Sequence, residues 1–173
     1  MKIVFVVGTK NSGKTTVAEY IVKRLADMGH KIATVKHIHH EFTVDTEGKD
    51  TYRMSKAGSR MVVSFSPSEI AILRPPGDVE EEFRKLSNQM LEEKFDFLVV
   101  EGFKVMSAGV PFIFRILTCK TKEELDELIP IMLPKIDCIS GVVSPTIEGK
   151  EYKGIPVIKY PDEAEVLIAK ILG

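Results

Sequence analysis

The segment Gly8–Thr15 reads GTKNSGKT and matches the spacing G-x-x-x-x-G-K-[ST] at every fixed position. Glycines at these positions let the backbone turn tightly and direct successive N–H groups toward anionic oxygens. The lysine is a point charge for the terminal phosphates of a nucleotide, and the threonine hydroxyl is a ligand for Mg²⁺. The pattern therefore predicts a loop that binds a nucleoside triphosphate together with Mg²⁺.

The candidate phosphate contacts form one continuous set. They are Gly8, Thr9, Lys10, Asn11, Ser12, Gly13, Lys14, Thr15 and Thr16. Lys14 should reach the β- and γ-phosphates and is also a candidate catalytic residue, and Thr15 is the expected metal ligand. The alternative interpretation is a glycine-rich turn that Ser12 caps, with a solvated Lys14 and an ordinary Thr15.

A second acidic group should lie near this loop, because one hydroxyl and the phosphate oxygens leave several Mg²⁺ positions to water or carboxylate. Glu101 follows four apolar residues and is the leading candidate for both catalysis and metal binding. The other interpretation is a carboxylate at a strand end that pairs with a nearby lysine. Asp45 and Asp50 are further candidates, since polar loops of nucleotide switches approach the γ-phosphate.

Three histidines, His37, His39 and His40, follow a short β-type run. Imidazole is a common metal ligand, and Glu41 and Asp45 are close in sequence. Contacts to phosphate or another ligand, a metal site, and a plain surface loop all remain possible interpretations of this cluster.

The elements that must position these residues alternate along the chain. Apolar, β-branched runs predict strands at 2–7, 31–36, 95–101, 111–117, 136–143 and 155–160. Helical spacing of apolar residues predicts helices at 16–29, 51–57, 78–94, 122–129 and 162–172. A hairpin, 60–66 with 69–73, interrupts the alternation. The pattern predicts a three-layer α/β fold of the P-loop NTPase type, with a mainly parallel sheet, right-handed crossovers and a β-hairpin insertion at about 60–73.

Composition limits the classes of function. The chain has 173 residues, a net charge of −1, 44% hydrophobic and 28% charged residues, which is typical of one globular domain over 1–173. The balanced charge argues against nonspecific nucleic-acid or membrane binding. No signal-type segment and no apolar run of roughly 20 residues is evident, so a cytoplasmic location is expected. Cys119 and Cys138 have no zinc-site spacing and are expected to be reduced, packed thiols.

Four stretches taken together carry a resemblance to a known family. They are Gly8–Thr15, VKHIHHEF at Val35–Phe42, DTEGKDTYR at Asp45–Arg53 followed by Ala57-Gly58, and VEGFK at Val100–Lys104. Their order and identity resemble the molybdopterin-guanine dinucleotide biosynthesis protein B (MobB) family. The resemblance runs over most of the first hundred or so residues and is weaker in the remainder.

The resemblance implies a homodimeric GTP-binding adaptor with weak GTPase activity. Such an adaptor acts beside the guanylyltransferase that joins GMP to molybdopterin. It implies Mg²⁺ near Thr15, with Glu101 or Asp45 behind it, and it makes the hairpin at 60–73 the candidate dimer contact. Possible molybdopterin or partner contacts fall on His37, His39, His40, Asp50 and Arg53.

One departure concerns the choice of nucleotide base. GTPases of the common type carry an Asn-Lys-x-Asp motif, and no such tetrapeptide follows the loop. The segment 141–145 occupies a plausible base-side position without specifying guanine, so the preference for GTP rests on the resemblance. A small-molecule kinase or ATP-dependent ligase is the alternative, although the arginines are scattered and do not predict a catalytic lid. A nucleotide-regulated interaction module without useful turnover is a third possibility.

Overall fold

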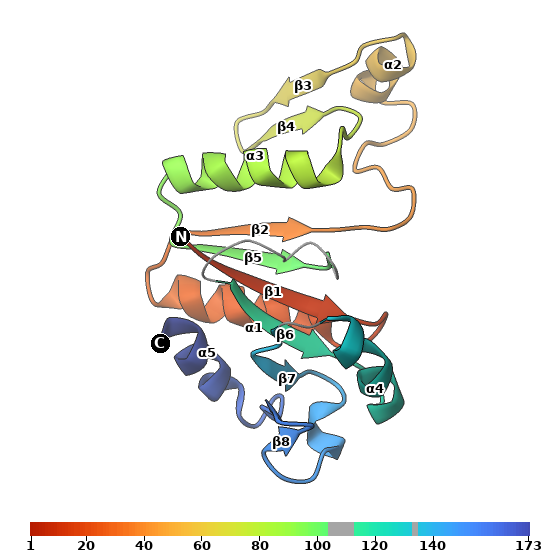
Figure 1. The fold of residues 1–173 in the computed structure, drawn as a ribbon. Helices are drawn as coiled ribbons and strands as arrows, with labels where there is room; N and C mark the ends of the chain where they lie inside the picture. Colours follow the sequence, from red (N-terminus) through yellow and green to blue (C-terminus); the bar gives the residue numbers. More distant parts are fainter. Residues whose placement is uncertain (104–112, 133–134) are drawn as a thin grey trace. The chain divides into compact units, whose positions relative to one another are not determined.

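The main sheet of the computed structural model has five strands that pair in parallel, and the structure describes residues 1–103, 113–132 and 135–173. The strand order is β2-β5-β1-β6-β7, with β1 at the centre (Figure 1). The strands are β2 Ile32–Lys36, β5 Phe97–Glu101, β1 Lys2–Gly8, β6 Ile113–Thr118 and β7 Cys138–Ser140. All four neighbouring pairs are parallel, so the carboxyl ends of the strands meet at one edge of the sheet.

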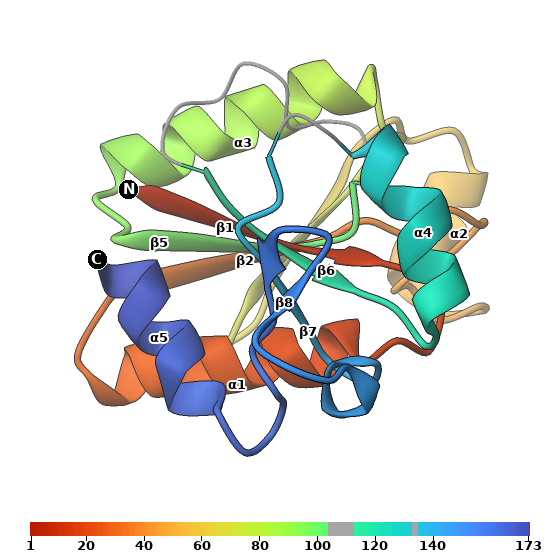
Figure 2. The same cartoon turned by 60° about the horizontal axis from the view of Figure 1, so that its bottom comes forward.

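Helices cover both faces of this sheet. Figure 2 shows α1, Lys14–Asp27, and α5, Ala164–Leu172, on one face, and α4, Lys122–Ile131, on the other. Right-handed crossovers that leave the central β1 and β6 in opposite directions place their helices on opposite faces. The predicted fold class, α/β with a mainly parallel central sheet, is confirmed.

The core lies between β1 and the helices α1 and α5. Val17, Ile21 and Leu25 are buried on one stripe of α1, because a spacing of four residues brings side chains to the same face of a helix. They pack in one cluster with Val4 and Val6 of β1 and with buried residues of α5. Burial on both faces explains why β1 reads as a continuous apolar run and not as an alternating one.

Gly29 ends α1 as the sequence predicts. Its φ is +87°, a conformation that other residues adopt only with strain. The N–H of Gly29 donates to the carbonyl of Ala26 at 2.9 Å, and the N–H of His30 donates to that of Leu25 at 3.2 Å. These two bonds form a Schellman motif, which satisfies carbonyls that the helix end would otherwise leave without donors.

The chain groups into two compact units, Met1–His37 with Ser87–Gly173 and Ile38–Leu86. The second unit contains α2, Asp50–Lys56, and the antiparallel strands β3, Val62–Phe65, and β4, Ile70–Leu73. Helix α3, Val79–Glu92, begins in the second unit and ends in the first. The predicted hairpin is confirmed, whereas one domain over 1–173 stays a prediction.

The hairpin has one apolar face within the second unit. The register pairs Val63 with Ile72 and Phe65 with Ile70, so these four side chains share a face. All four are exposed to solvent within the structure. Such a face is a candidate surface for association.

The C-terminal part differs from the sequence prediction. A strand at 155–160 is wrong, because only Ile155–Pro156 is a strand, β9, and it pairs antiparallel with β8, Glu151–Tyr152, in a separate two-stranded sheet. Val157 adds a single bridge to Ile139 of the main sheet. Proline has no N–H to donate to a ladder; Pro156 lies within the predicted segment, and Pro161 follows it directly.

Strand β7 is also shorter than predicted. The predicted strand 136–143 is reduced to Cys138–Ser140, because Gly141 takes a φ of +78° and turns the chain into a short 3₁₀ helix, Ser144–Thr146. The prediction for 111–117 is confirmed from residue 113 onward, and residues 111–112 lie outside the described part.

Cys119 and Cys138 are buried thiols, as predicted. Burial disfavours the charged thiolate and raises the pKa of Cys138 to about 12. None of the helices in the described part of the chain is long and apolar enough to cross a bilayer.

Candidate functional site

The predicted phosphate loop connects the carboxyl end of β1 to the first turn of α1. Gly8, the last residue of β1, has a φ of +148°, and a Cβ placed there would lie 1.7 Å from the carbonyl oxygen of Thr118 on β6. Gly13 has a φ of +87° and is the N-cap residue of α1. The two fixed glycines of the motif therefore have separate tasks: Gly8 allows close approach of two strands, and Gly13 allows the turn into the helix.

A cavity of about 480 Å³ opens above this turn. It is lined by Lys10–Thr16 together with Glu101 and Val142. The N-terminus of α1 forms part of its wall, where helix N–H groups and the positive end of the helix dipole favour an anion. Lys10 and Lys14 add positive charge to the same wall. The cavity thus has the size and charge for the phosphates of a nucleotide.

Ser12 stabilises the conformation of the loop from its buried side. Its side chain is fully buried, and its hydroxyl donates to the carbonyl of Thr9 at 2.8 Å and lies 2.7 Å from the hydroxyl oxygen of Thr118. The helix is capped at Gly13 and not by the Ser12 side chain. The ammonium of Lys14 donates to the carbonyl of Thr9, so Lys14 lies back across the loop. The interpretation as a Ser12-capped turn with a solvated Lys14 does not describe this geometry.

Thr9 connects the loop to helix α4. Its hydroxyl donates to Oε2 of Glu124 at 2.6 Å, and the backbone N–H of Lys120 donates to the same oxygen at 2.8 Å. The Lys120 ammonium lies 3.0 Å from Oε1. The hydrogen bond from Thr9 is the largest cause that lowers the pKa of Glu124, from 4.5 to about 2. The ionised carboxylate of Glu124 therefore connects Thr9, at the start of the loop, to α4 by a hydrogen bond.

Replacing Glu124 with glutamine is expected to lower the free energy of unfolding at pH 7 by about 1.5 kcal/mol, the usual size for one hydrogen bond to a charged group. A carboxyl whose pKa is depressed in the folded state stabilises it above the unfolded-state pKa, and this stabilisation is lost as pH falls through the folded-state pKa. The difference between the two proteins should therefore shrink between about pH 4.5 and pH 2. Urea unfolding followed by circular dichroism across that range measures it, and a pH-independent difference would contradict the assignment.

Glu101 lies beside Thr15, the threonine that the motif predicts to be a metal ligand. The Thr15 hydroxyl is 3.0 Å from each carboxylate oxygen of Glu101, and the Lys36 ammonium is 3.3 Å from Oε2. The parallel register explains this grouping, because Val6, Glu101 and Lys36 occupy matched positions on three neighbouring strands. Glu101 thus shows both expected features, proximity to the loop and a lysine partner. A carboxylate and a hydroxyl in contact at the edge of the cavity are suitable for a hydrated Mg²⁺.

His37 lies at the end of β2 in the first unit. Its N–H donates to the carbonyl of Glu101 at 2.9 Å, and its ring stacks on Phe103 with 4.1 Å between ring centres. The backbone of His37 is therefore hydrogen-bonded to that of Glu101 on the neighbouring strand. His37 is not among the residues that line the cavity at Lys10–Thr16.

The other predicted contacts belong to the second unit. They are His39, His40, Asp45, Asp50 and Arg53. Oδ1 of Asp45 accepts a hydrogen bond from the Thr51 hydroxyl at 2.7 Å. Oδ1 of Asp50 lies 3.6 Å from Nη1 of Arg53. Their roles toward nucleotide, Mg²⁺ or pterin stay predictions. No group of three or more His, Cys, Asp or Glu side chains that could hold a metal occurs in the described ranges, so the histidine metal site gains no support.

The sequence of this chain matches a known protein family. The sequence model of the family described as "Molybdopterin guanine dinucleotide synthesis protein B" matches residues 3–134, which is most of the chain. The chain belongs to the MobB family. The resemblance inferred from four short stretches is thereby confirmed, and it includes all of the loop from Gly8 to Thr16.

Sequence relatives agree with the MobB assignment. A putative molybdopterin-guanine dinucleotide biosynthesis adapter protein of Methanocaldococcus jannaschii is 38% identical over 104 residues, 60% of this chain and 42% of that protein. The adapter protein of Haemophilus influenzae is 33% identical over 125 residues, 72% of this chain and 69% of that protein. The match thus spans less than half of the Methanocaldococcus protein.

The MobB structure of Bacillus subtilis has the same fold. It aligns with a TM-score of 0.74 at 24% identity over 98% of each chain. The alignment extends through the C-terminal part, beyond the residues that the family model matches.

The sequence did not predict three residues that support this MobB site. They are Lys36, Thr118 and Glu124. Val142, which lines the cavity, lies in the segment 141–145 that the sequence placed on the base side. Thr121 and Glu124 have the spacing of a capping box, which is a local sequence signal for the start of a helix. In the structure, the Glu124 carboxylate accepts a hydrogen bond from the backbone amide of Lys120. The spacing does not show that the same carboxylate also binds Thr9, which lies 115 residues away in sequence.

Proposed function

We propose that this MobB-family chain binds GTP with Mg²⁺ at Gly8–Thr16 and serves as an adaptor in molybdopterin guanine dinucleotide biosynthesis, assisting the guanylyltransferase. The observation that carries the nucleotide part is the contact of the Thr15 hydroxyl with Glu101, 3.0 Å, at the edge of a cavity lined by Lys10–Thr16. This contact supports a proposal in which phosphate and metal bind at one place. The pathway role is taken from the family and its named relatives.

The residues present fit a nucleotide-bound Mg²⁺. Thr15 would supply one oxygen ligand, and Glu101 would accept from metal-bound water or take the place of one. Bound Mg²⁺ neutralises charge that develops on the phosphates. Lys14 would move from the Thr9 carbonyl to the β- and γ-phosphates, a change that needs only its flexible side chain. Lys36, whose ammonium lies 3.3 Å from Oε2 of Glu101, would orient that carboxylate.

Weak hydrolysis is the expected activity. Fast phosphoryl transfer needs several positive groups around the transferred phosphate, often arginines. Lys10 and Lys14 are the cationic side chains in the described lining of this cavity, and that lining contains no arginine. This observation favours the adaptor over the alternative, a small-molecule kinase or ATP-dependent ligase.

Nucleotide titration tests the proposed function directly. With Mg²⁺ present, GTP is expected to bind more tightly than ATP, with phosphate release slow compared with enzymes that turn over at about 1–100 s⁻¹. A guanylyltransferase is expected to copurify with the protein. Tight preference for ATP would contradict the guanine assignment, and rapid transfer to a small acceptor would contradict the adaptor role.

Replacing Glu101 with glutamine is expected to reduce the effect of Mg²⁺ on GTP affinity by about tenfold, the usual size for loss of a group that orients a metal ligand. Affinity in EDTA should change little, because the loop contacts remain. Titration of both proteins with and without Mg²⁺ measures this. Asp96→Asn is the matched control, since Asp96 lies just before β5 and accepts from the amide of Lys31 at 2.8 Å. Equal effects of the two substitutions would argue against a metal role for Glu101.

The proposal includes a homodimer that the hairpin forms. Val63, Phe65, Ile70 and Ile72 share one exposed face of β3 and β4. Covering such a face contributes about 25 cal/mol for each Å² of apolar surface removed from water. The contacts proposed for molybdopterin or the partner remain His37, His39, His40, Asp50 and Arg53. Sedimentation equilibrium measures the expected dimer.

A further inference from the structure

A second cavity of the first unit shares lining residues with the cavity at Lys10–Thr16. Its volume is about 360 Å³, and residues of α1, β2 and β5 line it; it is called the α1–β2 cavity below. Thr15 and Glu101 line both cavities. Lys36 lines the α1–β2 cavity and is not among the described residues that line the other. Lys36 therefore approaches the Thr15–Glu101 pair from the α1–β2 cavity.

The Glu101 carboxylate has one neutral and one cationic partner. The Thr15 hydroxyl lies 3.0 Å from each carboxylate oxygen, and the Lys36 ammonium lies 3.3 Å from Oε2. The Glu101 side chain is only 14% exposed, whereas the Lys36 side chain is 55% exposed. A carboxylate with so little contact with water depends on a nearby cation to compensate its charge. In this structure, Lys36 compensates the charge of Glu101.

Strand pairing places Lys36 at this position. Lys36 and Glu101 are paired residues at the ends of the parallel strands β2 and β5. Paired residues of neighbouring strands have side chains on the same face of a sheet. The N–H of the next residue, His37, donates to the Glu101 carbonyl at 2.9 Å and connects the two strand ends. The ion pair is thus a consequence of the sheet register.

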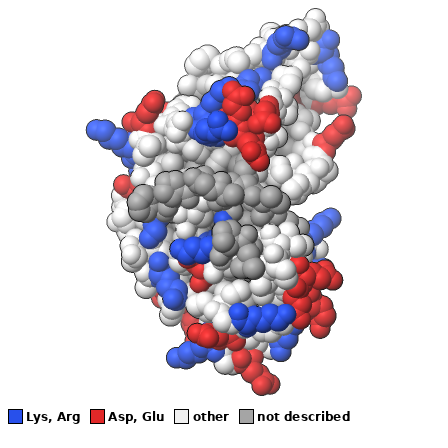
Figure 3. Space-filling model, in the orientation of Figure 1, with Lys and Arg blue, Asp and Glu red and all other residues white. Residues whose placement is uncertain are grey.

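This ion pair reduces the attraction of the site for a divalent cation. Mg²⁺ and Mn²⁺ prefer oxygen ligands, and a cation on the Thr15 oxygen would share the Glu101 carboxylate with Lys36. Like charges repel, and Glu101 and Lys36 together have no net charge. The whole chain has a net charge of −1, and Figure 3 shows acidic and basic side chains on the same face of the molecule. Attraction sufficient for the metal must therefore come from phosphates.

We propose that Lys36 makes metal binding depend on the nucleotide. Its ammonium neutralises Glu101, so that a divalent cation binds at Thr15 only together with the phosphates of a nucleoside triphosphate. This inference rests on the proposed metal role of Thr15 and Glu101. Lys36 is a positioning residue, because it acts through Glu101. Without its charge, Glu101 attracts a divalent cation even when no phosphate is bound.

Binding of Mn²⁺ to the full chain without nucleotide tests this proposal. Mn²⁺ takes the same oxygen ligands as Mg²⁺, and electron paramagnetic resonance measures its free concentration. Lys36→Met and Lys36→Gln are each expected to bind Mn²⁺ at least about tenfold more tightly than the unsubstituted protein, the lower limit of the usual effect of groups beside metal ligands. Lys36→Arg keeps the charge and should bind as weakly as the unsubstituted protein. Adding Glu101→Gln to Lys36→Met should abolish the gain.

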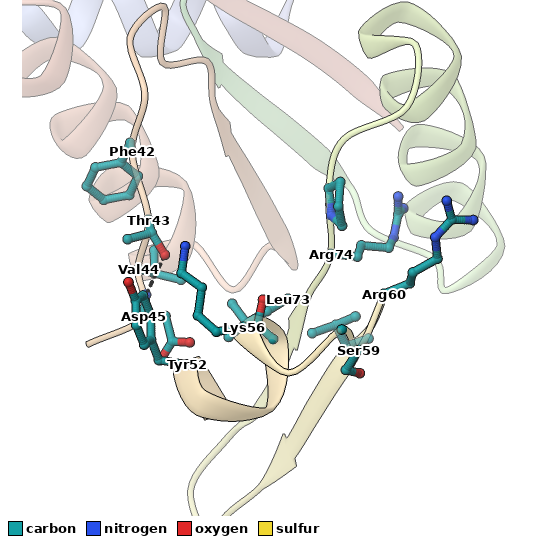
Figure 4. A pocket seen from close by; sticks show the side chains of 14 residues that line it. Phe42, Thr43, Val44, Asp45, Tyr52, Lys56, Ser59, Arg60, Leu73 and Arg74 are labelled. Atoms are coloured by element: carbon teal, nitrogen blue, oxygen red, sulfur yellow. Dashed lines mark hydrogen bonds between the residues drawn. The ribbon is translucent and has the colours of Figure 1, made fainter. Parts of the chain in front are cut away.

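Two other lysines provide matched controls. Lys23 lines the same α1–β2 cavity, but its ammonium pairs with Asp27 at 3.0 Å. Lys56 lines the cavity of the second unit that Figure 4 shows, and all lining residues of that cavity belong to Ile38–Leu86. Lys23→Met and Lys56→Met remove the same charge and should leave Mn²⁺ binding unchanged. An equal gain in either control would assign the effect to net charge and overturn the proposal.

Titration with GTP distinguishes this proposal from the proposed function. The complex of Mg²⁺ with GTP has a net negative charge, so Lys36→Met should not strengthen its binding, although it strengthens the binding of Mn²⁺ alone. Failure of the unsubstituted protein to bind GTP would contradict the proposed function and would not alter the Mn²⁺ comparison. Mn²⁺ binding that is equally tight in Lys36→Met, Lys36→Gln and the unsubstituted protein would overturn the role of Lys36.

Discussion

Alanine at position 14 is expected to lower the affinity for GTP by one to two orders of magnitude. The Lys14 ammonium, now on the carbonyl of Thr9, is the side chain placed to reach the β- and γ-phosphates from the first turn of α1. A charge-assisted contact of this kind contributes on the order of 1.5 to 3 kcal/mol. Titration with a fluorescent GTP analogue in the presence of Mg²⁺ measures the loss.

The matched control for this substitution is Lys23→Ala. Lys23 is an exposed lysine on the same helix, and its ammonium pairs with Asp27 at 3.0 Å. This variant should bind GTP with nearly the original affinity, which separates the specific contact from the general charge of α1. Circular dichroism of both variants checks that the fold is intact. An unchanged affinity in Lys14→Ala would refute the central assignment of the site.

Alanine at position 8 is expected to prevent stable folding. A Cβ on Gly8 would lie 1.7 Å from the carbonyl oxygen of Thr118, and that oxygen belongs to the neighbouring strand at the point where β1 and β6 pair. The overlap involves backbone on both sides, so relief requires separation of two central strands. The expected loss is at least about 4 kcal/mol, a large part of the stability of an ordinary domain. Urea unfolding, or the yield of folded protein, measures it.

Gly29→Ala separates steric overlap from backbone strain. Gly29 also has a positive φ, +87°, but a Cβ there would have no atom within 4 Å. Its substitution should therefore cost only about 1 to 2 kcal/mol, the strain of the left-handed conformation. If the two variants lost equal stability, the close approach of Gly8 to Thr118 would not be the reason for a glycine at position 8.

Sequence reasoning identified the architecture because its signals are local. Apolar runs and helical spacing were sufficient for the parallel sheet, the helices and the hairpin of β3 and β4. The strand at 155–160 was wrong because an apolar run indicates burial more directly than strand pairing, and proline at 156 and 161 has no N–H for a ladder. Val157 and Ile158 are buried, as their apolar side chains indicate, but they do not continue a strand to residue 160.

Local signals also explain which candidate site residues could be predicted. The phosphate loop is complete within one short segment, so its glycines, lysine and hydroxyls are visible without a fold. Glu101 was found because it follows an apolar run, and the carboxyl ends of parallel strands share one edge of the sheet. The arginines that line the cavity of the second unit were interpreted as scattered, since Arg60 and Arg74 come together only when the hairpin folds.

The sequence by itself determined that this chain has a loop of the G-x-x-x-x-G-K-[ST] type on a parallel α/β sheet, since both depend on residues close together in the chain. The tertiary structure decided which distant groups complete the loop. Thr15 meets Glu101 across 86 residues, Ser12 meets Thr118 across 106, and Thr9 meets Glu124 across 115. Those contacts depend on strand order, which places β5 and β6 on either side of β1, and hydrophobic periodicity carries no information about that order.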